Sequence, residues 1–271
     1  MRLAFVGKGG AGKSAICGTF CRLLARRGRR VVAVDSDPLP GLAYSLGLAI
    51  EYSPPIPPEA VVERAEGETG PRFRLRPDLD PGEAVEAYSV AAPDGVRFLQ
   101  FGKLSGAADQ DLFRPQVAFR HIVAGLPRGR WDVIGDLPGG TRQAFTGWGS
   151  WAEAVLVVVE PTAKSLLSGR RLARMVEIEG GPSAVAAVAS KVRSDADVAM
   201  IAERTGLAVL GAVPWDEDLA EAERRQQAPL DLAPRGAGVR AVASLLDEVL
   251  AAGLGGLDAP TTASATASEA P

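Results

Sequence analysis

The sequence predicts an α/β domain built on a mostly parallel sheet of roughly seven to eight strands, with helices on both faces. Apolar, β-rich runs alternate with segments of helical periodicity along most of the 271 residues, as in strand–helix units whose strands run parallel. The run Val155 to Val159 is apolar throughout, which is typical of a strand covered on both faces.

The elements follow from these runs in chain order. Leu3 to Val6 is a short apolar run, and Ile16, Phe20, Leu23 and Leu24 then recur at helical spacing. The expected strands are 2–6, 31–35, 97–101, 131–136, 154–159, 184–189 and 207–213. The expected helices are 13–27, 115–125, 164–177, 195–205, 217–227 and 237–252.

Two segments depart from this rhythm. Residues 51–96 are rich in proline and contain short alternating pieces at Phe73 to Arg76 and Val85 to Val90, so we expect an insertion with a loop and a small β-hairpin or edge strands. Its role is either decoration of the core or partner contact. The Ala/Thr/Ser/Pro-rich residues 256–271 are expected to be a disordered tail, which leaves a single domain over residues 1–255.

Composition narrows the function classes. The net charge of −3 argues against a dedicated nucleic-acid binder. No run of about twenty apolar residues is present, so no membrane span is expected. The first strand begins at once, leaving no room for a signal peptide, and we expect a cytoplasmic protein. Cys17 and Cys21 are expected to be buried and reduced, and a single histidine excludes a histidine-based triad or zinc site.

The most specific motif lies between the first strand and the first helix. Gly7, Gly12, Lys13 and Ser14 satisfy G-x-x-x-x-G-K-[ST], the phosphate-binding loop of P-loop NTPases. Backbone amides and the helix N-terminus would cradle phosphates, Lys13 would reach the β- and γ-phosphates, and Ser14 would bind Mg²⁺. The expected nucleotide-binding residues are Gly7, Lys8, Gly9, Gly10, Ala11, Gly12, Lys13, Ser14 and Ala15.

Two predicted strands end in carboxylates beside this loop. The strand 31–35 runs into Asp35-Ser36-Asp37-Pro38, and the strand 131–136 runs into Asp136-Leu137-Pro138-Gly139-Gly140. Carboxylates at these strand ends hold Mg²⁺ or orient an attacking water. We therefore expect Asp37 and Asp136, with Ser14, at a magnesium site.

Together these residues resemble the MinD/ParA group of dimeric ATPases, whose deviant Walker A motif K-G-G-x-x-K-[ST] is met by residues 8–14. The resemblance implies that Lys8 reaches across a two-fold axis to the ATP of the partner subunit. It also implies that Asp37, in the switch I Asp-Pro, orients the attacking water and that Asp136 is the switch II aspartate. Lys8, Lys13 and Asp37 are thus the expected catalytic residues.

Within the group the chain is most similar to the CooC-type ATPases, which assist nickel insertion into carbon monoxide dehydrogenase. The patches at 95–103 and 157–166 carry this likeness. Residues 105–114 lack the cysteine pair of the nickel-handling members, so no nickel site is predicted. By position, Ser190 and Pro214 are expected to line the base pocket, although Ser190-Lys191 departs from the asparagine that relatives often have.

Three functions are compatible with these patterns. The favoured one is an ATP-hydrolysing dimeric switch that assists maturation of a metalloenzyme or another client complex. The alternative is a ParA- or MinD-like partition or positioning ATPase, against which the acidic charge balance and the absence of a basic tail helix count. A third, a nucleotide sensor that does not hydrolyse, is disfavoured because Lys13, Ser14, Asp37 and Asp136 are all present.

Overall fold

A mixed eight-stranded sheet forms the centre of the molecule in the computed structural model, which describes residues 1–36, 41–49, 56–65, 67, 69–100, 113–138, 149–175 and 182–254. Its strand order is β10-β9-β8-β1-β7-β2-β6-β5. All pairs are parallel except that of β5 with β6. The strands are β1 (Arg2–Gly7), β2 (Val31–Asp35), β5 (Val90–Ala91), β6 (Arg97–Gln100), β7 (Asp132–Asp136), β8 (Ala154–Val159), β9 (Ala184–Val192) and β10 (Val209–Pro214).

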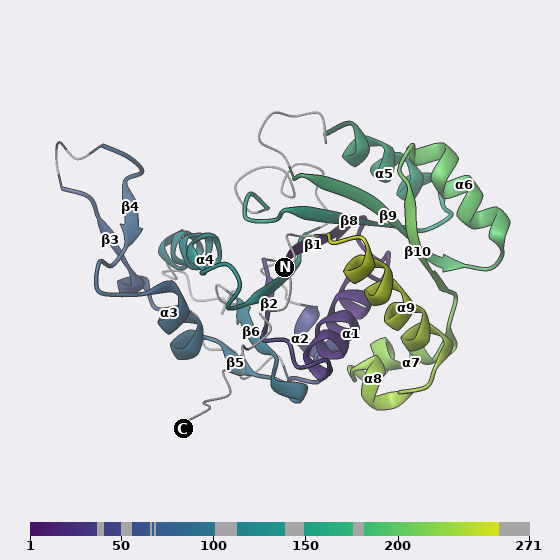
Figure 1. Ribbon diagram of the computed structural model, residues 1–271, viewed down its shortest axis with the longest axis horizontal. Coiled ribbons are helices and arrows are strands. Elements are labelled where there is room, and N and C mark those ends of the chain that lie inside the picture. Colours follow the sequence, from purple (N-terminus) through teal and green to yellow (C-terminus); the bar gives the residue numbers. More distant parts are fainter. Residues whose placement is uncertain are drawn as a thin grey trace, which may run out of the picture.

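Helices cover both faces of this sheet, as Figure 1 shows. On one face lie α1 (Lys13–Arg26), α2 (Leu42–Ser45) and α9 (Ala237–Ala251), with α7 (Glu217–Arg225) and α8 (Pro229–Leu232) beside them. On the other lie α3 (Pro81–Tyr88), α4 (Phe113–Gly125), α5 (Ala163–Met175) and α6 (Asp195–Thr205). The predicted fold class, a mostly parallel sheet between two helical layers, is confirmed.

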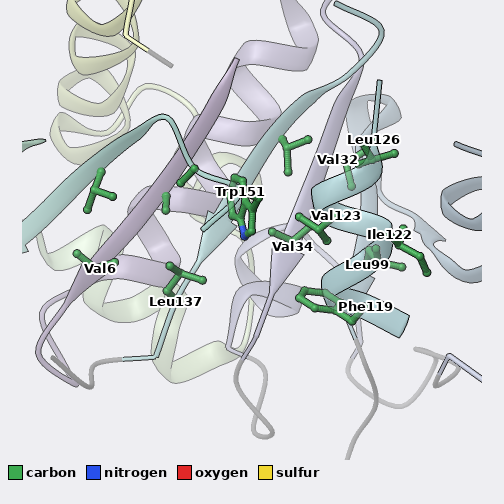
Figure 2. Close-up of a cluster of buried hydrophobic side chains, with 14 of the residues drawn as sticks. Val6, Val32, Val34, Leu99, Phe119, Ile122, Val123, Leu126, Leu137 and Trp151 are labelled. Carbon is green, nitrogen blue, oxygen red and sulfur yellow. The ribbon is translucent and has the colours of Figure 1, made fainter. Parts of the chain in front are cut away.

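Alternation along the buried strands divides the core into two layers. In β1, Leu3 and Phe5 belong to the layer of α1 and α9, whereas Ala4 and Val6 belong to the layer of α4 and α5. Figure 2 shows α4 laying Phe119 and Ile122 beside the sheet residue Leu99. Each fully buried side chain of this size contributes about 1.5–3 kcal/mol relative to exposure, so this packing fixes the strand ends that carry the site.

The predicted hairpin lies within the insertion. Strands β3 (Val61–Glu63) and β4 (Phe73–Leu75) pair antiparallel in a separate two-stranded sheet. They are preceded by the short 3-10 helix η2 (Pro58–Ala60), and in Figure 1 the hairpin projects from the body next to α4. This part of the expectation is confirmed, while residues 51–55, 66 and 68 lie outside the described residues.

A second part of that expectation was wrong. The alternating piece Val85 to Val90 is mostly helix, because α3 spans Pro81–Tyr88 and only Val90 enters the edge strand β5. The helix begins at Asp80, whose carboxylate accepts hydrogen bonds from Gly82 N at 2.8 Å and Glu83 N at 3.2 Å. An aspartate cap followed by proline is a strong helix start signal. It outweighs a short alternation of apolar and polar residues.

The other predicted strands and helices are confirmed, whereas the predicted tail is not tested. All seven predicted strands and all six predicted helices are present. The bounds of β2, β8 and α6 are those predicted, and the other elements have shifted ends; the short helices α2 and α8 were not predicted. The expected disordered tail, residues 256–271, lies outside the described residues. Among those that are described, no helix is both long enough and apolar enough to span a bilayer.

Candidate functional site

The predicted phosphate-binding loop connects β1 to α1 at the carboxyl edge of the sheet. Position 7 requires a glycine because the backbone there lies close to β8. A Cβ built at Gly7 would lie 2.3 Å from the Val158 carbonyl oxygen. Gly12, at φ 88°, is the left-handed residue from which α1 starts. The Ala11 amide donates to the Lys8 carbonyl at 3.1 Å, which closes the turn between them.

The N-terminus of α1 is suited to bind an anion. Its first turn contains no acidic residue, and no side chain caps its amides, so the N–H groups and the positive end of the helix dipole are available. A cavity of about 320 Å³ lies over this point. It is lined by Gly10, Gly12, Lys13, Ser14, Ala15, Gly41, Tyr44, Ser45, Leu219, Ala222, Glu223, Gln226, Gln227 and Pro229.

A hydroxyl and a carboxylate meet beside the cavity. The Ser14 Oγ donates a hydrogen bond to Asp136 Oδ2, although the two residues are 122 positions apart in the chain. Asp136 ends β7 and is only 5 % exposed. Hard oxygen donors of this kind are those that Mg²⁺ prefers. The structure thus brings together two of the three residues predicted for a magnesium site.

The third predicted residue cannot be placed. Asp37 and Pro38 lie outside the described residues, as do Gly139 and Gly140. The preceding carboxylate, Asp35, ends β2 in register with Asp136 of β7. It is buried, and its Oδ2 accepts a hydrogen bond from the Leu42 amide at 3.1 Å, so it ties the end of β2 to the start of α2.

Strand β9 supports the loop from behind. The Ser190 Oγ donates to the Ala11 carbonyl at 2.8 Å, and the Lys191 Nζ donates to the Gly10 carbonyl at 2.6 Å. Lys191 has a φ of 57°, an uncommon backbone conformation for a residue other than glycine. Sequence reasoning named Ser190 but missed the contact of Lys191, because no local pattern links β9 to a loop near the N-terminus.

A second cavity, of about 100 Å³, adjoins the first and shares with it Gly12, Ala15, Leu219 and Glu223. Ser190 and Pro214, the two residues predicted to surround a base, both line it. Trp215 lines it as well, and the Arg193 guanidinium lies 5.1 Å from the centroid of the Trp215 ring. Trp215 was not predicted; a large aromatic residue directly after Pro214 was the only available signal.

The two loop lysines differ in their surroundings. Lys13, on the first turn of α1, lines the larger cavity, as expected for a phosphate ligand. Lys8 is half-exposed at the rim of the loop and lines neither of these two cavities. Among the residues that the structure describes, Lys8 has no ion-pair partner.

The cysteines belong to the core rather than to the site. Cys17 and Cys21 are both buried on the inner face of α1, as predicted. Burial, followed by the hydrogen bond with Cys21, raises the pKa of the Cys17 thiol well above its ordinary value, which disfavours the thiolate. Within the described parts of the chain, no three His, Cys, Asp or Glu residues form a group that could hold a metal ion.

A family model described as the CobQ/CobB/MinD/ParA nucleotide binding domain matches residues 3–230. This match covers every described element from the second residue of β1 to the start of α8, including the loop, the ends of β2 and β7, and both cavities.

Individual proteins give a consistent picture. An uncharacterized ATP-binding protein of Methanocaldococcus jannaschii is 29% identical over 231 residues, which are 82% of this chain and 88% of that protein. The carbon monoxide dehydrogenase accessory protein CooC of Rhodospirillum rubrum is 28% identical over 263 residues, which are 92% and 97% of the two chains.

A solved structure of the septum site-determining protein MinD complexed with Mg-ADP, from Pyrococcus horikoshii, has the same fold. It superimposes with a TM-score of 0.65 at 18% identity and covers 92% of this chain and 95% of that one.

Proposed function

Because the chain belongs to the CobQ/CobB/MinD/ParA family of nucleotide-binding domains, we propose that it hydrolyses ATP with Mg²⁺ as a dimeric switch serving a client protein. The observation that carries the proposal is the meeting of Ser14 and Asp136 at the uncapped N-terminus of α1. Triphosphate and magnesium require this combination of open amides, a lysine and hard oxygen ligands.

Each residue has a defined task in this proposal. The amides of the loop and of α1 hold the β- and γ-phosphates, and the Lys13 ammonium neutralises charge that develops on them during transfer. Ser14 and Asp136 would hold Mg²⁺, which when bound would neutralise charge on the phosphates and orient them. Asp37 orients the attacking water, a role that rests on the family resemblance of Asp37-Pro38.

The dimer is supported by Lys8. Its ammonium has no acidic partner among the described residues, and it stands at the exposed rim beside Gly9 and Gly10. A second subunit facing this rim would bring its own nucleotide to Lys8, so that each active site is completed by its partner. Hydrolysis then removes the phosphate that both subunits contact and weakens their association.

Two observations support the accessory role, namely the similarity to CooC and the inserted hairpin. The likeness to CooC extends over most of both chains, and CooC is an accessory protein of carbon monoxide dehydrogenase. The projecting hairpin β3–β4 adds a surface beyond the nucleotide-binding sheet. These observations favour a client complex over a surface-bound positioning system.

Phosphate release from ATP tests the proposed activity. The unchanged protein should turn over ATP only with Mg²⁺, and Lys13→Ala should lose turnover by at least about a hundredfold. Asp37→Ala should retain ATP binding in calorimetry and lose hydrolysis. Lys164→Ala, an exposed lysine on α5, is the control and should behave as wild type. Normal hydrolysis by Asp37→Ala would remove that residue from the mechanism, and no Mg²⁺-dependent turnover by wild type would refute the activity.

A further inference from the structure

A groove lies between the inserted hairpin and α4, with a volume of about 380 Å³. Arg72 and Phe73 of the hairpin form one wall. Phe113, Val117, Arg120 and His121 of α4 form the other. The groove shares no described lining residue with the two cavities beside the phosphate-binding loop, so it is a separate feature of the surface.

Helix α4 has two distinct faces. Phe119, Ile122 and Val123 are buried against the sheet, as Figure 2 shows. Phe113, Val117 and His121 are spaced four residues apart and therefore form a stripe along another face. The Phe113 side chain is 58% exposed, the largest exposure among the large hydrophobic residues that the structure describes. Its ring packs edge-on against Phe73, with centroids 5.6 Å apart, so the aromatic rings of the two walls meet.

The groove is also basic. Arg72, Arg120 and His121 line it, and no aspartate or glutamate is among its described lining residues. Arg72 is held over the Phe73 ring at 5.2 Å and pairs with Glu63 at 2.7 Å. Arg120 and His121 form no ion pair with any residue that the structure describes. In a chain whose net charge is −3, two arginines beside apolar side chains, with no acid among the described lining residues, are a specific feature.

We propose that this groove is the docking site for an acidic segment of the client protein, with an apolar side chain between its carboxylates. The apolar residue would pack against Phe113 and Val117, and the carboxylates would face Arg120 and His121. The inference rests on the proposed function only in assuming that a client exists. The proposal also assigns a function to the insertion, since the inserted hairpin supplies one wall of the groove.

A nucleic acid fits these walls less well. A nucleic-acid strand carries regularly spaced phosphates and needs a continuous basic track. Here one of the two arginines, Arg72, is already paired with Glu63. The centre of the helix stripe is an aliphatic residue, Val117. A short peptide with one apolar anchor and flanking acids matches the apolar and basic side chains of the groove.

The test uses a fluorescein-labelled peptide of glutamates around a central Leu-Phe pair, titrated with the full chain and followed by anisotropy. The same peptide with lysines in place of glutamates is the ligand control. The acidic peptide should bind and the basic one should not. Arg120→Glu/His121→Glu should weaken binding about tenfold or more, since two attractive contacts become repulsive. Phe113→Ala should weaken it by removing the apolar contact.

A matched variant separates docking from general electrostatics. Arg170→Glu/Arg171→Glu changes charge at two adjacent cationic positions on the exposed side of α5 and should leave peptide affinity unchanged. Equal weakening by this control, equal binding of the lysine peptide, or tighter binding of a single-stranded oligonucleotide would each overturn the proposal. Basal ATP hydrolysis and the urea midpoint of the groove variants should match wild type. A wild type that binds the peptide without hydrolysing ATP would refute the activity while supporting the groove.

Discussion

Replacing Ser190 with alanine removes one hydrogen bond from beneath the phosphate-binding loop. The Ser190 hydroxyl lies 2.8 Å from the Ala11 carbonyl oxygen, and the two residues are 2 % and 0 % exposed. The Ala11 carbonyl oxygen then loses its side-chain donor, and leaving a buried acceptor unsatisfied costs about 1–3 kcal/mol. The void left by one oxygen is smaller than a methyl group and adds less than about 1 kcal/mol.

Urea unfolding of Ser190→Ala should therefore show the free energy of unfolding lowered by about 1–3 kcal/mol at an unchanged m-value. Part of this energy orders the loop, so the Kd for ATP in calorimetry should rise on the order of threefold to tenfold.

The control is Ser183→Ala, at the residue directly before the same strand. The Ser183 Oγ donates to the Glu153 carbonyl at 2.7 Å but is exposed, and its loss should cost no more than about 0.5 kcal/mol. If the two variants are equally stable and bind ATP equally well, the proposed support of the loop by β9 is refuted.

Two further predictions concern stability. Gly7→Ala should destabilise the fold by about 3 kcal/mol or more, because its Cβ would lie 2.3 Å from the Val158 carbonyl oxygen at φ 149°; a urea midpoint equal to wild type would contradict this. Burial opposes ionisation of Asp94, but hydrogen bonds from Arg26 and Arg22 lower its pKa. Because Asp94 is exposed and solvent screens its ion pairs, Asp94→Asn should cost about 1 kcal/mol at neutral pH. Because the folded pKa is depressed, that stabilisation is present above the ordinary aspartate pKa and is lost as the pH falls through the folded value. The difference between variant and wild type should shrink toward acid pH, and a constant difference in acid titrations of stability would argue against the ion pairs.

The sequence predicts those parts of the site whose residues lie close together in the chain. The loop from Gly7 to Ser14 is one contiguous pattern whose geometry depends on glycines at defined positions. The meeting of Ser14 with Asp136 could also be inferred, because parallel strands end at one edge of the sheet and β1 and β7 are neighbours there. Such an inference needs only the class of fold and the ends of the strands.

Other features depend on tertiary placement that no sequence pattern records. The bond from Lys191 to Gly10 spans 181 positions, and it forms only because β9 and β8 carry the lysine to the back of the loop. Gln226 and Gln227 form part of the wall of the cavity over the N-terminus of α1. Their position depends on the turn that connects α7 to α8. Helix α3 was missed for a different reason. The short alternation of apolar and polar residues from Val85 to Val90 predicts a strand, whereas the Asp80-Pro81 start signal predicts a helix.

The central claim is that ATP is held between two subunits through Lys8. Sedimentation velocity of the slowly hydrolysing Asp37→Ala protein with ATP and Mg²⁺, compared with Asp37→Ala/Lys8→Ala, tests it most directly. The first protein should sediment as a dimer in ATP and as a monomer in ADP. The second should bind ATP in calorimetry yet remain a monomer. Dimerisation of the Lys8-deficient protein to the same extent, or a persistent monomer of the first protein at saturating ATP, would contradict the account.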